Sequence, residues 1–319
     1  MRVLFLGSPP FATPILRALC ESPWRPTLVV TPEDKPRGRG RRLEPSPVIR
    51  TAEAAGVGLL HPPREGGARD ATFKDAVRAA EPDVIVVASF GELLDQEFLD
   101  IALTLNVHGS LLPRWRGASP VQAALFAGDD VTGVSIQRVV LALDAGDVLH
   151  RRELAIRPDH TAGELFEDLA TLGASTLVEA LATVAGGTAT YTPQDPAQIT
   201  HCRKLKKGAG VVDWMRPAIE LERQVRAMNP WPSAQTTLPD GRGLKLHRAE
   251  LRPDTPVAAP GSVLVADDEL VVATGAGGLA LLELQAAGKR ALPASDFLRG
   301  VRLSPGDRLG TGSEHAPGL

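Results

Sequence analysis

Short apolar runs and amphipathic stretches alternate along the first hundred residues of the chain. Three apolar runs have the length of buried strands and lie at residues 2–8, 27–31 and 83–89. Three stretches with apolar residues at helical spacing lie at residues 13–22, 46–55 and 71–80. This alternation predicts an α/β fold, with a doubly wound Rossmann-like N-terminal domain whose ligands bind beyond the carboxyl ends of its strands.

A different pattern follows in the second half. Residues 146–187 predict a strand pair and then a long helix that ends in glycines. The next segment is rich in Thr, Pro and Gln and has little helical or strand period, as expected of a linker. After a helical stretch at 215–230, five short alternating runs lie at residues 234–238, 243–251, 261–266, 269–274 and 278–285. They predict a smaller C-terminal β-barrel (OB-like) domain. The predicted boundaries are a first domain at 1–187, the linker at 188–204 and a second domain at 205–310.

The composition suits a soluble globular enzyme. Of 319 residues, 43% are apolar and 23% are charged, enough for a sizeable core in each of two domains. No apolar run approaches the roughly 18 residues of a membrane span, so we expect a cytoplasmic protein without a membrane partner. The two cysteines lie far apart without metal-ligand spacing, which predicts reduced structural thiols. With a net charge of −3, any affinity for nucleic acid depends on local basic patches.

The stretch TLNVHGSLLPRWRGASP, residues 104–120, carries the strongest chemical signal. Alternate side chains of a strand share a face, so Asn106 and His108 project together while their apolar neighbours anchor the strand. Gly109 lets the backbone turn at the carboxyl end, where this fold class binds ligands. Downstream, Asp144 lies in the glycine-containing loop LDAGDVL, which could fold back onto the histidine.

Each of these three residues also has a structural interpretation. A single histidine at a strand end is more often a hydrogen-bonded structural residue than a catalyst, and an isolated Asp or Asn can fix a turn. All three in this order, with SLLPRWRG directly behind, favour a catalytic site. Other classes fit less well. GSPPFA lacks the second and third glycines of a dinucleotide fingerprint, and the chain has neither a GxSxG motif nor clustered metal ligands.

The motif NVHGSLLPRWRGASPVQ followed by LDAGDVL resembles the folate-dependent formyltransferases. That resemblance implies that Asn106, His108 and Asp144 form the catalytic set, without a metal. It also implies that 10-formyltetrahydrofolate is the co-substrate, held by the segment SLLP, which comprises Ser110, Leu111, Leu112 and Pro113. A narrower resemblance, to the members of the family that formylate methionyl-tRNA, rests on GSPPFA, DKPRGRGRRLEPSP, VDW, NPWPSA and GKR.

The narrower resemblance implies initiator methionyl-tRNA as the partner, in translation initiation, and we expect a monomer. Runs of charge are more often solvated surface, but the arginine-rich loop follows a central predicted strand beside the proposed site. A second basic cluster lies at the junction with the small domain. The expected tRNA-binding residues are Arg37, Arg39, Arg41, Arg42, Arg203, Lys204, Lys206 and Lys207, with Arg42 the strongest candidate.

Formyl transfer to an α-amine passes through a tetrahedral intermediate with negative charge on oxygen. Asn106 can donate a hydrogen bond to that oxygen, and a protonated His108 can stabilise it. Asp144 could relay protons from the attacking amine. Three alternatives stay open, namely formyl transfer to a small amine, a non-catalytic RNA-binding protein, and a hydrolase that releases formate. The NPWP stretch, residues 229–232, is predicted to pack a helix end against the barrel.

Overall fold

The computed structural model describes residues 1–33 and 44–310, and this part of the chain forms two compact units. Unit 1 comprises residues 1–117, 131–155 and 166–201, and unit 2 comprises residues 118–130, 156–165 and the chain from 202 on. The domain boundaries predicted at residues 187 and 205 stay a prediction. Short segments of the first half, including one helix, group with unit 2.

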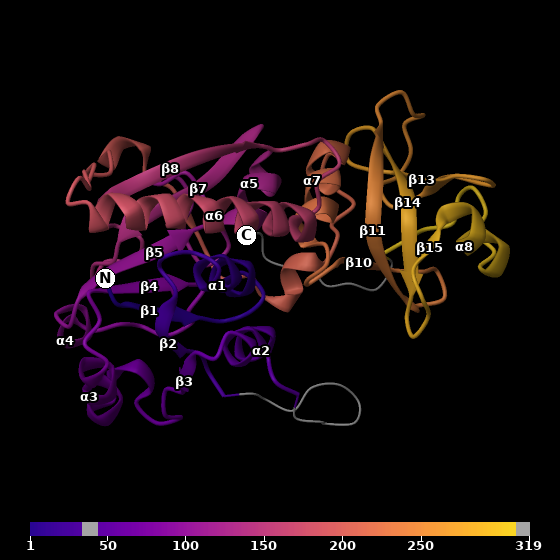
Figure 1. Cartoon of the computed structure of the whole chain (residues 1–319). Coiled ribbons are helices and arrows are strands. Elements are labelled where there is room, and N and C mark those ends of the chain that lie inside the picture. The colour runs from indigo at the N-terminus through magenta and orange to yellow at the C-terminus, as the bar shows by residue number, and fades with distance from the viewer. Residues whose placement is uncertain (34–43, 311–319) are drawn as a thin grey trace. The chain divides into compact units, whose positions relative to one another are not determined.

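Unit 1 is built on a seven-stranded sheet (Figure 1). Its strands are β1 (Val3–Gly7), β2 (Pro26–Val30), β3 (Gly58–Leu60), β4 (Val84–Ala88), β5 (Leu103–His108), β7 (Val131–Arg138) and β8 (Val148–Ala155). Its helices are α1 (Ala12–Cys20), α2 (Pro47–Ala54), α3 (Ala71–Ala79), α4 (Gln96–Leu99) and most of α6 (Ala162–Ala185). Short elements are β6 (Arg116–Gly117), the 3₁₀ turns η1 (Gly67–Arg69) and η2 (Pro196–Gln198), and β9 (His201–Cys202).

The strand order is β3-β2-β1-β4-β5-β7-β8. Strands β3, β2, β1, β4 and β5 run parallel to one another, as the apolar runs predict. Strand β7 runs antiparallel to both of its neighbours, β5 and β8. The predicted strand pair in residues 146–187 is wrong, because β8 is a single strand paired with β7. The middle of β8 is exposed and charged, which an edge strand tolerates.

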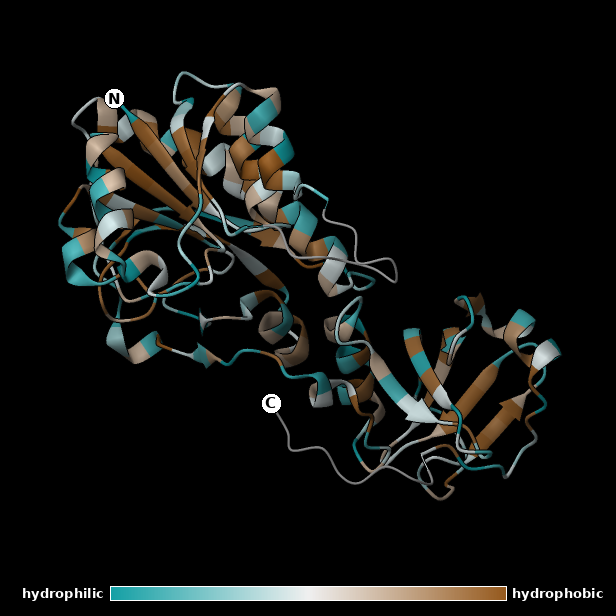
Figure 2. Ribbon diagram, turned by 90° about the horizontal axis from the view of Figure 1, so that it is seen from below, coloured by the Kyte–Doolittle hydropathy of each residue, from teal (hydrophilic) through white to brown (hydrophobic). Residues whose placement is uncertain are grey.

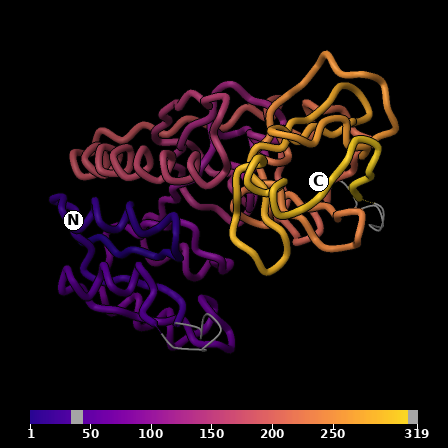
Figure 3. Tube along the Cα trace, turned by 90° about the vertical axis from the view of Figure 1, so that its right-hand side faces the viewer, coloured from indigo at the N-terminus to yellow at the C-terminus, as the bar shows by residue number. Residues whose placement is uncertain are grey.

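Helices cover both faces of this sheet. On one face, Leu6 and Ile85 pack against Phe73 of α3 and Phe98 of α4. On the other, α6 runs beside α1, and the rings of Phe11 and Phe166 meet at 5.0 Å, edge to face (Figures 1 and 3). The strands between them are the most hydrophobic segments of unit 1 (Figure 2). This layered packing is what the alternation of apolar runs and amphipathic stretches predicts.

Helix α6 is long and apolar enough to pass a composition test for a membrane span. Its leucines instead serve the protein core, since Leu169, Leu177 and Leu181 are fully buried. Part of the helix lies over β5 and β7, where a Cβ at Gly173 would lie 3.0 Å from Cγ1 of Val107. The length of α6 therefore reflects the width of the sheet that it covers.

Unit 2 contains an antiparallel sheet in the order β10-β11-β14-β13-β12, with β15 paired to β14. Its strands are β10 (Ala234–Thr237), β11 (Gly243–Arg252), β12 (Val263–Ala266), β13 (Leu270–Ala273), β14 (Gly278–Ala286) and β15 (Leu292–Pro293). Its helices are α5 (Pro120–Ala127), α7 (Ala218–Met228) and α8 (Ala294–Gly300), with the 3₁₀ turn η3 (Lys207–Gly210). All five predicted strands are confirmed, and the short β15 and α8 were not predicted.

The prediction for the NPWP stretch is wrong in one respect. Trp231 is 56% exposed, whereas Pro232 and Ser233 are buried. The turn packs through its proline and serine, and the indole projects outward.

The start of α6 and strand β11 are joined through one carboxylate. Glu164 accepts hydrogen bonds from the backbone NH and hydroxyl of Thr161, both at its Oε2, and pairs with Arg248 at 2.7 Å. These contacts lower the pKa of Glu164 from 4.5 to about 2, and the backbone hydrogen bond from Thr161 has the largest effect. Thr161 and Glu164 thus form a capping box at the helix N-terminus.

We expect Glu164→Gln to lower stability at neutral pH by about 0.5 to 1 kcal/mol, a modest figure because the carboxylate is 43% exposed. A depressed folded-state pKa stabilises the fold above pH 4.5, and this contribution is lost as pH falls toward 2. Urea unfolding between pH 7 and 3 should show the variant and the wild type converging at acid pH. A gap of constant size would contradict this account. Glu53→Gln, at an exposed position on α2, is the control.

Candidate active site

The end of β5 carries two polar side chains whose direction is set by pairing with β7. Asn106 lies opposite Gln137, and His108 lies opposite Ser135. Directly opposed residues of antiparallel strands share a face, so these four side chains project to the same side. Val107 projects to the other side, where α6 covers it. The predicted division between a polar and an apolar face of this strand is confirmed.

Asp144 lies between β7 and β8 and reaches back to this polar face. Its Oδ2 accepts a hydrogen bond from the backbone NH of Gly117 at 2.8 Å. Its Oδ1 accepts from the side-chain amide of Gln137 at 2.9 Å and, at 3.4 Å, from that of Asn106. The same oxygen lies 3.6 Å from Nδ1 of His108. The structure therefore brings together the three residues that the sequence singles out.

The imidazole of His108 is held from both sides and is only 7% exposed. Its Nε2 lies 2.9 Å from the backbone oxygen of Trp115, and since a carbonyl oxygen only accepts, Nε2 carries the hydrogen. Nδ1 faces the carboxylate of Asp144. Both ring nitrogens thus face oxygen atoms, at 2.9 Å for Nε2 and 3.6 Å for Nδ1.

Gln137 is a site residue that the sequence did not single out. It is 2% exposed and donates to the same carboxylate oxygen that faces the histidine. Position 137 lies in β7, and only the pairing register places it opposite Asn106. No local motif marks such a residue, because its role depends on a contact between separate strands.

The backbone at Asp144 is itself unusual, with φ at +48°. This left-handed conformation aims the side chain back at β5, and Asp is one of the residue types that tolerate it. Two positions on, Gly146 leaves no room for a side chain, because a Cβ there would overlap the backbone oxygen of Arg138. The loop that carries the carboxylate is therefore packed against the end of β7.

We expect Gly146→Ala to lower kcat by about 10- to 100-fold, since the loop must shift and a displacement of about 1 Å at a catalytic group has effects of this size. A lower unfolding temperature should accompany the loss. The control is Gly58→Ala at the opposite sheet edge, where the nearest atom to a new Cβ lies at 3.5 Å, an ordinary contact. Steady-state kinetics and thermal unfolding of both variants test this, and equal activity of the two would contradict it.

The SLLP segment is largely an internal structure. Ser110, Leu112 and Pro113 are buried, and the Ser110 hydroxyl donates to the backbone oxygen of Arg114 at 2.6 Å. The backbone NH of Leu112 donates to the hydroxyl of Ser135 at 3.0 Å. Only Leu111 of the four predicted residues is partly exposed. A bound ligand would therefore meet this segment through Leu111 and backbone groups.

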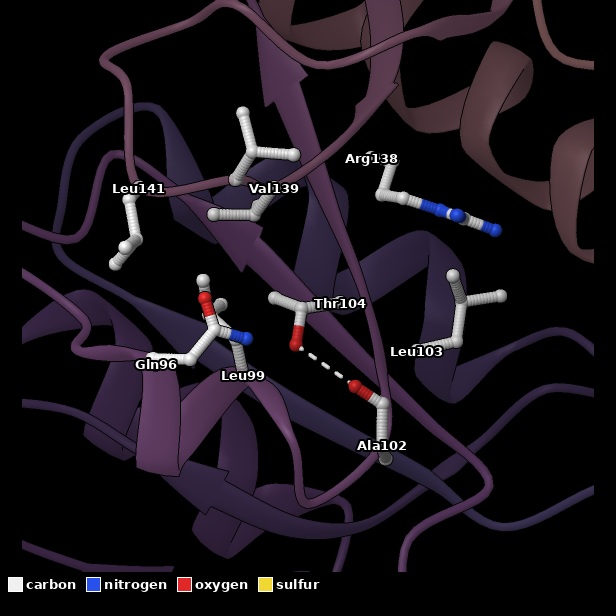
Figure 4. Close-up of a pocket in the computed structure, with 9 residues that line it drawn as sticks. Gln96, Leu99, Ala102, Leu103, Thr104, Arg138, Val139 and Leu141 are labelled. Carbon is white, nitrogen blue, oxygen red and sulfur yellow. Dashed lines mark hydrogen bonds between the residues drawn. The ribbon is translucent and has the colours of Figure 1, made fainter.

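The structure also contains a pocket of about 370 Å³ next to the Asp144 loop (Figure 4). It is lined by Gln96, Leu99, Ala102, Leu103, Thr104, Arg138, Val139, Val140 and Leu141. Thr104 lies two residues before Asn106, so both project from the same face of β5. The pocket lies between α4, which contributes Gln96 and Leu99, and the chain from Arg138 to Leu141 that leads to Asp144. Most of its lining is apolar, with a carboxamide, a hydroxyl and a guanidinium among the leucines and valines.

Of the predicted tRNA-binding residues, Arg37, Arg39, Arg41 and Arg42 lie outside the described residues. The other four, Arg203, Lys204, Lys206 and Lys207, are exposed in unit 2. Cys20 and Cys202 are free thiols, as expected. Within residues 1–33 and 44–310, no group of three His, Cys, Asp or Glu side chains is placed to hold a metal ion.

Comparison with known proteins gives consistent results over both parts of the chain. Residues 1–181 match the family described as formyl transferase, and residues 204–302 match the formyl transferase C-terminal domain. A methionyl-tRNA formyltransferase from Methylococcus capsulatus is 42% identical over 313 residues, which cover 98% of this chain and 100% of that protein. One from Desulfotalea psychrophila is 42% identical over 306 residues, covering 95% and 94% respectively.

Solved structures resemble the chain in fold. HypX from Aquifex aeolicus, in complex with tetrahydrofolic acid, is 20% identical with a TM-score of 0.62, covering 93% of this chain and 47% of that one. An N-formyltransferase from Helicobacter canadensis, with folinic acid and dTDP-3-aminofucose, is 12% identical with a TM-score of 0.65, covering 91% of this chain and 100% of that one. At these identities the likeness concerns the fold alone.

Proposed function

This chain belongs to the formyltransferase family, as a member of its methionyl-tRNA formyltransferases, and we propose that it formylates the α-amino group of methionyl initiator tRNA. The formyl donor is a folate derivative, and we propose its 10-formyltetrahydrofolate form. The observation that carries the proposal is the meeting of Asn106, His108 and Asp144 at the carboxyl end of β5, within 3.6 Å of one carboxylate oxygen.

The reaction requires one bond to form and one to break. The neutral amine of the methionyl group attacks the formyl carbon, and the carbonyl oxygen takes up the negative charge. In our proposal the Asn106 amide, which is only weakly engaged at 3.4 Å, donates to that oxygen, and the protonated ring of His108 stabilises the charge.

Proton transfer completes the step. The amine loses a proton to the Asp144 carboxylate, whose Oδ1 lies 3.6 Å from Nδ1 of the His108 ring. When the intermediate collapses, the bond from the formyl carbon to the folate nitrogen breaks and that nitrogen takes up the proton that Asp144 received. The products are N-formylmethionyl-tRNA and tetrahydrofolate, so atoms and charge balance without an oxidant or reductant.

We assign the flat ring of the donor to the pocket beside the Asp144 loop. Its walls include Leu99, Leu103 and Val139, which suit an aromatic ring, and Gln96 and Thr104 offer polar atoms for the ring edge. Leu111 and the backbone of the SLLP segment are proposed to contact the donor closer to the reacting carbon. The basic residues named from the sequence are proposed to contact the phosphates of the tRNA.

Initiator tRNA serves translation, so we propose a cytoplasmic enzyme without a membrane partner. We also propose that the enzyme is a monomer. Light scattering after size-exclusion chromatography tests the monomer, and a dimer at micromolar concentration would refute it.

The acceptor is tested with a labelled formyl donor and three acceptors: methionyl initiator tRNA, an amino sugar nucleotide, and water alone. We expect label in the tRNA with little transfer to the sugar and little free formate. Preferential labelling of the sugar would favour the small-amine alternative. Formate release that is insensitive to charged tRNA would indicate a hydrolase. The 42% identity to methionyl-tRNA formyltransferases over nearly the whole chain favours the tRNA acceptor.

A further inference from the structure

The segment Thr192–Thr200, between α6 and β9, contacts the chain segments that hold the side chains of His108 and Asp144. At its start, the backbone NH and oxygen of Thr192 pair with those of Val148 at 2.9 Å, which fixes the segment to β8. The sequence predicts only a linker here. Two of its side chains, Gln194 and Thr200, make contacts that an ordinary linker does not need.

Gln194 holds the Asp144 loop and is 9% exposed. Its amide nitrogen donates to the backbone oxygens of Asp144 at 2.8 Å and Gly146 at 2.7 Å. Its amide oxygen accepts from Nε of Arg116 at 3.0 Å. The neighbouring backbone group, the NH of Gly117, donates to the Asp144 carboxylate. Gln194 therefore joins the two chain segments that position this carboxylate.

Thr200 holds the segment that orients the histidine. Its hydroxyl oxygen accepts from the backbone NH of Trp115 at 2.9 Å, and its backbone oxygen accepts from the NH of Arg116 at 2.9 Å. Trp115 has φ at +61°, and its backbone oxygen is the acceptor for Nε2 of His108. A non-glycine residue in this conformation needs support from its surroundings.

We propose that Gln194 and Thr200 are positioning residues that fix the relative placement of the Asp144 carboxylate and the His108 ring. Neither touches the reacting atoms in this proposal, which rests on the proposed function. The physical reason is that one loop carries Asp144 and another, through the Trp115 backbone oxygen, orients the His108 ring. Without a common anchor each loop could shift by the fraction of an ångström that affects catalysis.

The test uses near-isosteric changes in the full chain. Thr200→Val keeps the shape but removes the acceptor for the Trp115 NH, and Thr200→Ser restores it. We expect Thr200→Val and Gln194→Leu to lower kcat by about 10- to 100-fold with little change in KM for either substrate. The pH profile of kcat should change in both variants. Thr200→Ser should recover most of the rate.

Gln198→Leu is the matched control, since Gln198 is exposed and donates to Asp195 in the same segment. Normal kcat and an unchanged pH profile in Thr200→Val and Gln194→Leu would overturn the proposal. So would a serine variant as slow as the valine variant, or losses fully explained by a lower fraction of folded enzyme. If the wild type itself failed to formylate methionyl-tRNA, the proposed function would fall instead.

A second and independent observation concerns Trp231 of unit 2, whose indole is 56% exposed on a firmly held turn. The NH of Ser233 donates to the backbone oxygen of Met228, and its hydroxyl donates to that of Pro230, both at 2.8 Å. Asn229 donates to the backbone oxygen of His247 at 2.8 Å. The indole is therefore presented to solvent by a turn with three anchors.

Basic residues lie on a segment that packs against the same turn. A Cβ at Gly210, the last residue of η3, would overlap the backbone oxygen of Ser233, two residues after Trp231. Lys207 begins η3, roughly 6 Å from its end at a rise of about 2 Å per residue. Lys206 and Lys207 are both exposed. An aromatic face beside cationic side chains is the combination that binds unpaired nucleotides.

We propose that Trp231 stacks on an unpaired base near the acceptor end of the tRNA while Lys206 and Lys207 contact its phosphates. This proposal deepens the proposed function and rests on it. Stacking contributes without charge, whereas each phosphate contact releases counterions, so the two contributions respond differently to salt.

Equilibrium binding of methionyl-tRNA to the full chain over a range of salt concentrations tests the assignment. Trp231→Ala should weaken binding about 10-fold without changing the slope of log K against log salt, and Trp231→Phe should keep most of the affinity. Lys207→Ala should reduce the magnitude of that slope by about 1. KM for the formyl donor should not change.

Met215→Ala is the control, because Met215 is an exposed apolar residue of the same unit, at 64%. Wild-type affinity in Trp231→Ala, or an effect no larger than that of Met215→Ala, would overturn the proposal. A protein partner whose binding needs Trp231 while tRNA binding does not would do the same. If the wild type did not bind methionyl-tRNA at all, the proposed function would be at fault.

Discussion

His108→Ala is expected to lower kcat for formyl transfer by about 10²- to 10⁴-fold, the usual size of a lost acid–base group. The imidazole is the only group at this site that faces both the Asp144 carboxylate, at 3.6 Å, and the Trp115 backbone oxygen, at 2.9 Å, among the residues that the structure describes. KM for the donor and for methionyl-tRNA should change little, because the ring acts on charge that develops during the reaction.

The comparison variant for this substitution is His61→Ala. Nδ1 of His61 lies 2.7 Å from the backbone oxygen of Thr31, just after β3, and the residue takes no part in the proposed chemistry. Its kcat should stay within about two-fold of the wild type. A His108→Ala enzyme that keeps its kcat and its unfolding temperature would refute the catalytic assignment.

The second large effect is expected for Asp144→Asn, with kcat lowered by about 10²- to 10⁴-fold. The substitution is nearly isosteric and suits the positive φ of +48°. It removes the charge and can place an amide NH₂ against the amides of Gln137 and Asn106, which now donate to Oδ1. The site would lose both its proton acceptor and the hydrogen bonds that converge on it.

Asp147→Asn tests whether any charge change in this loop has the same effect. The backbone oxygen of Asp147 accepts from the NH of Arg138 at 2.9 Å, a contact that the substitution keeps. Steady-state kinetics should show near-normal turnover for this control. Comparable losses at positions 144 and 147 would mean that the loop, and not the carboxylate, is what matters.

Much of this fold follows from local patterns. The apolar runs at 2–8, 27–31 and 83–89 became β1, β2 and β4, because a strand buried on both faces needs a continuous apolar sequence. The short runs of the second half became β10 to β14; β10 alternates between buried and partly exposed positions, whereas β13 is buried throughout. Elements with only two or three residues, such as β15 and β3, carry too little sequence to show a period.

The site was predictable to the extent that its residues lie on one strand. Asn106 and His108 share a face by simple alternation, and a loop after β7 was expected to return Asp144 to them. Gln137, Gln194 and Thr200 were missed, because their partners lie in separate segments of the chain and depend on register. Trp231 was misjudged since sequence does not tell which residue of a proline-rich turn faces inward.

The most direct test of the central claim, that His108 and Asp144 act as one unit, is a double-mutant cycle on kcat for methionyl initiator tRNA. The variants are His108→Ala, Asp144→Asn and the double substitution, each measured as folded enzyme. Because residues that act together have non-additive effects, we predict that the double variant is no more than about 10-fold slower than the slower single variant. If the two losses simply multiply, the residues act independently and the account is contradicted.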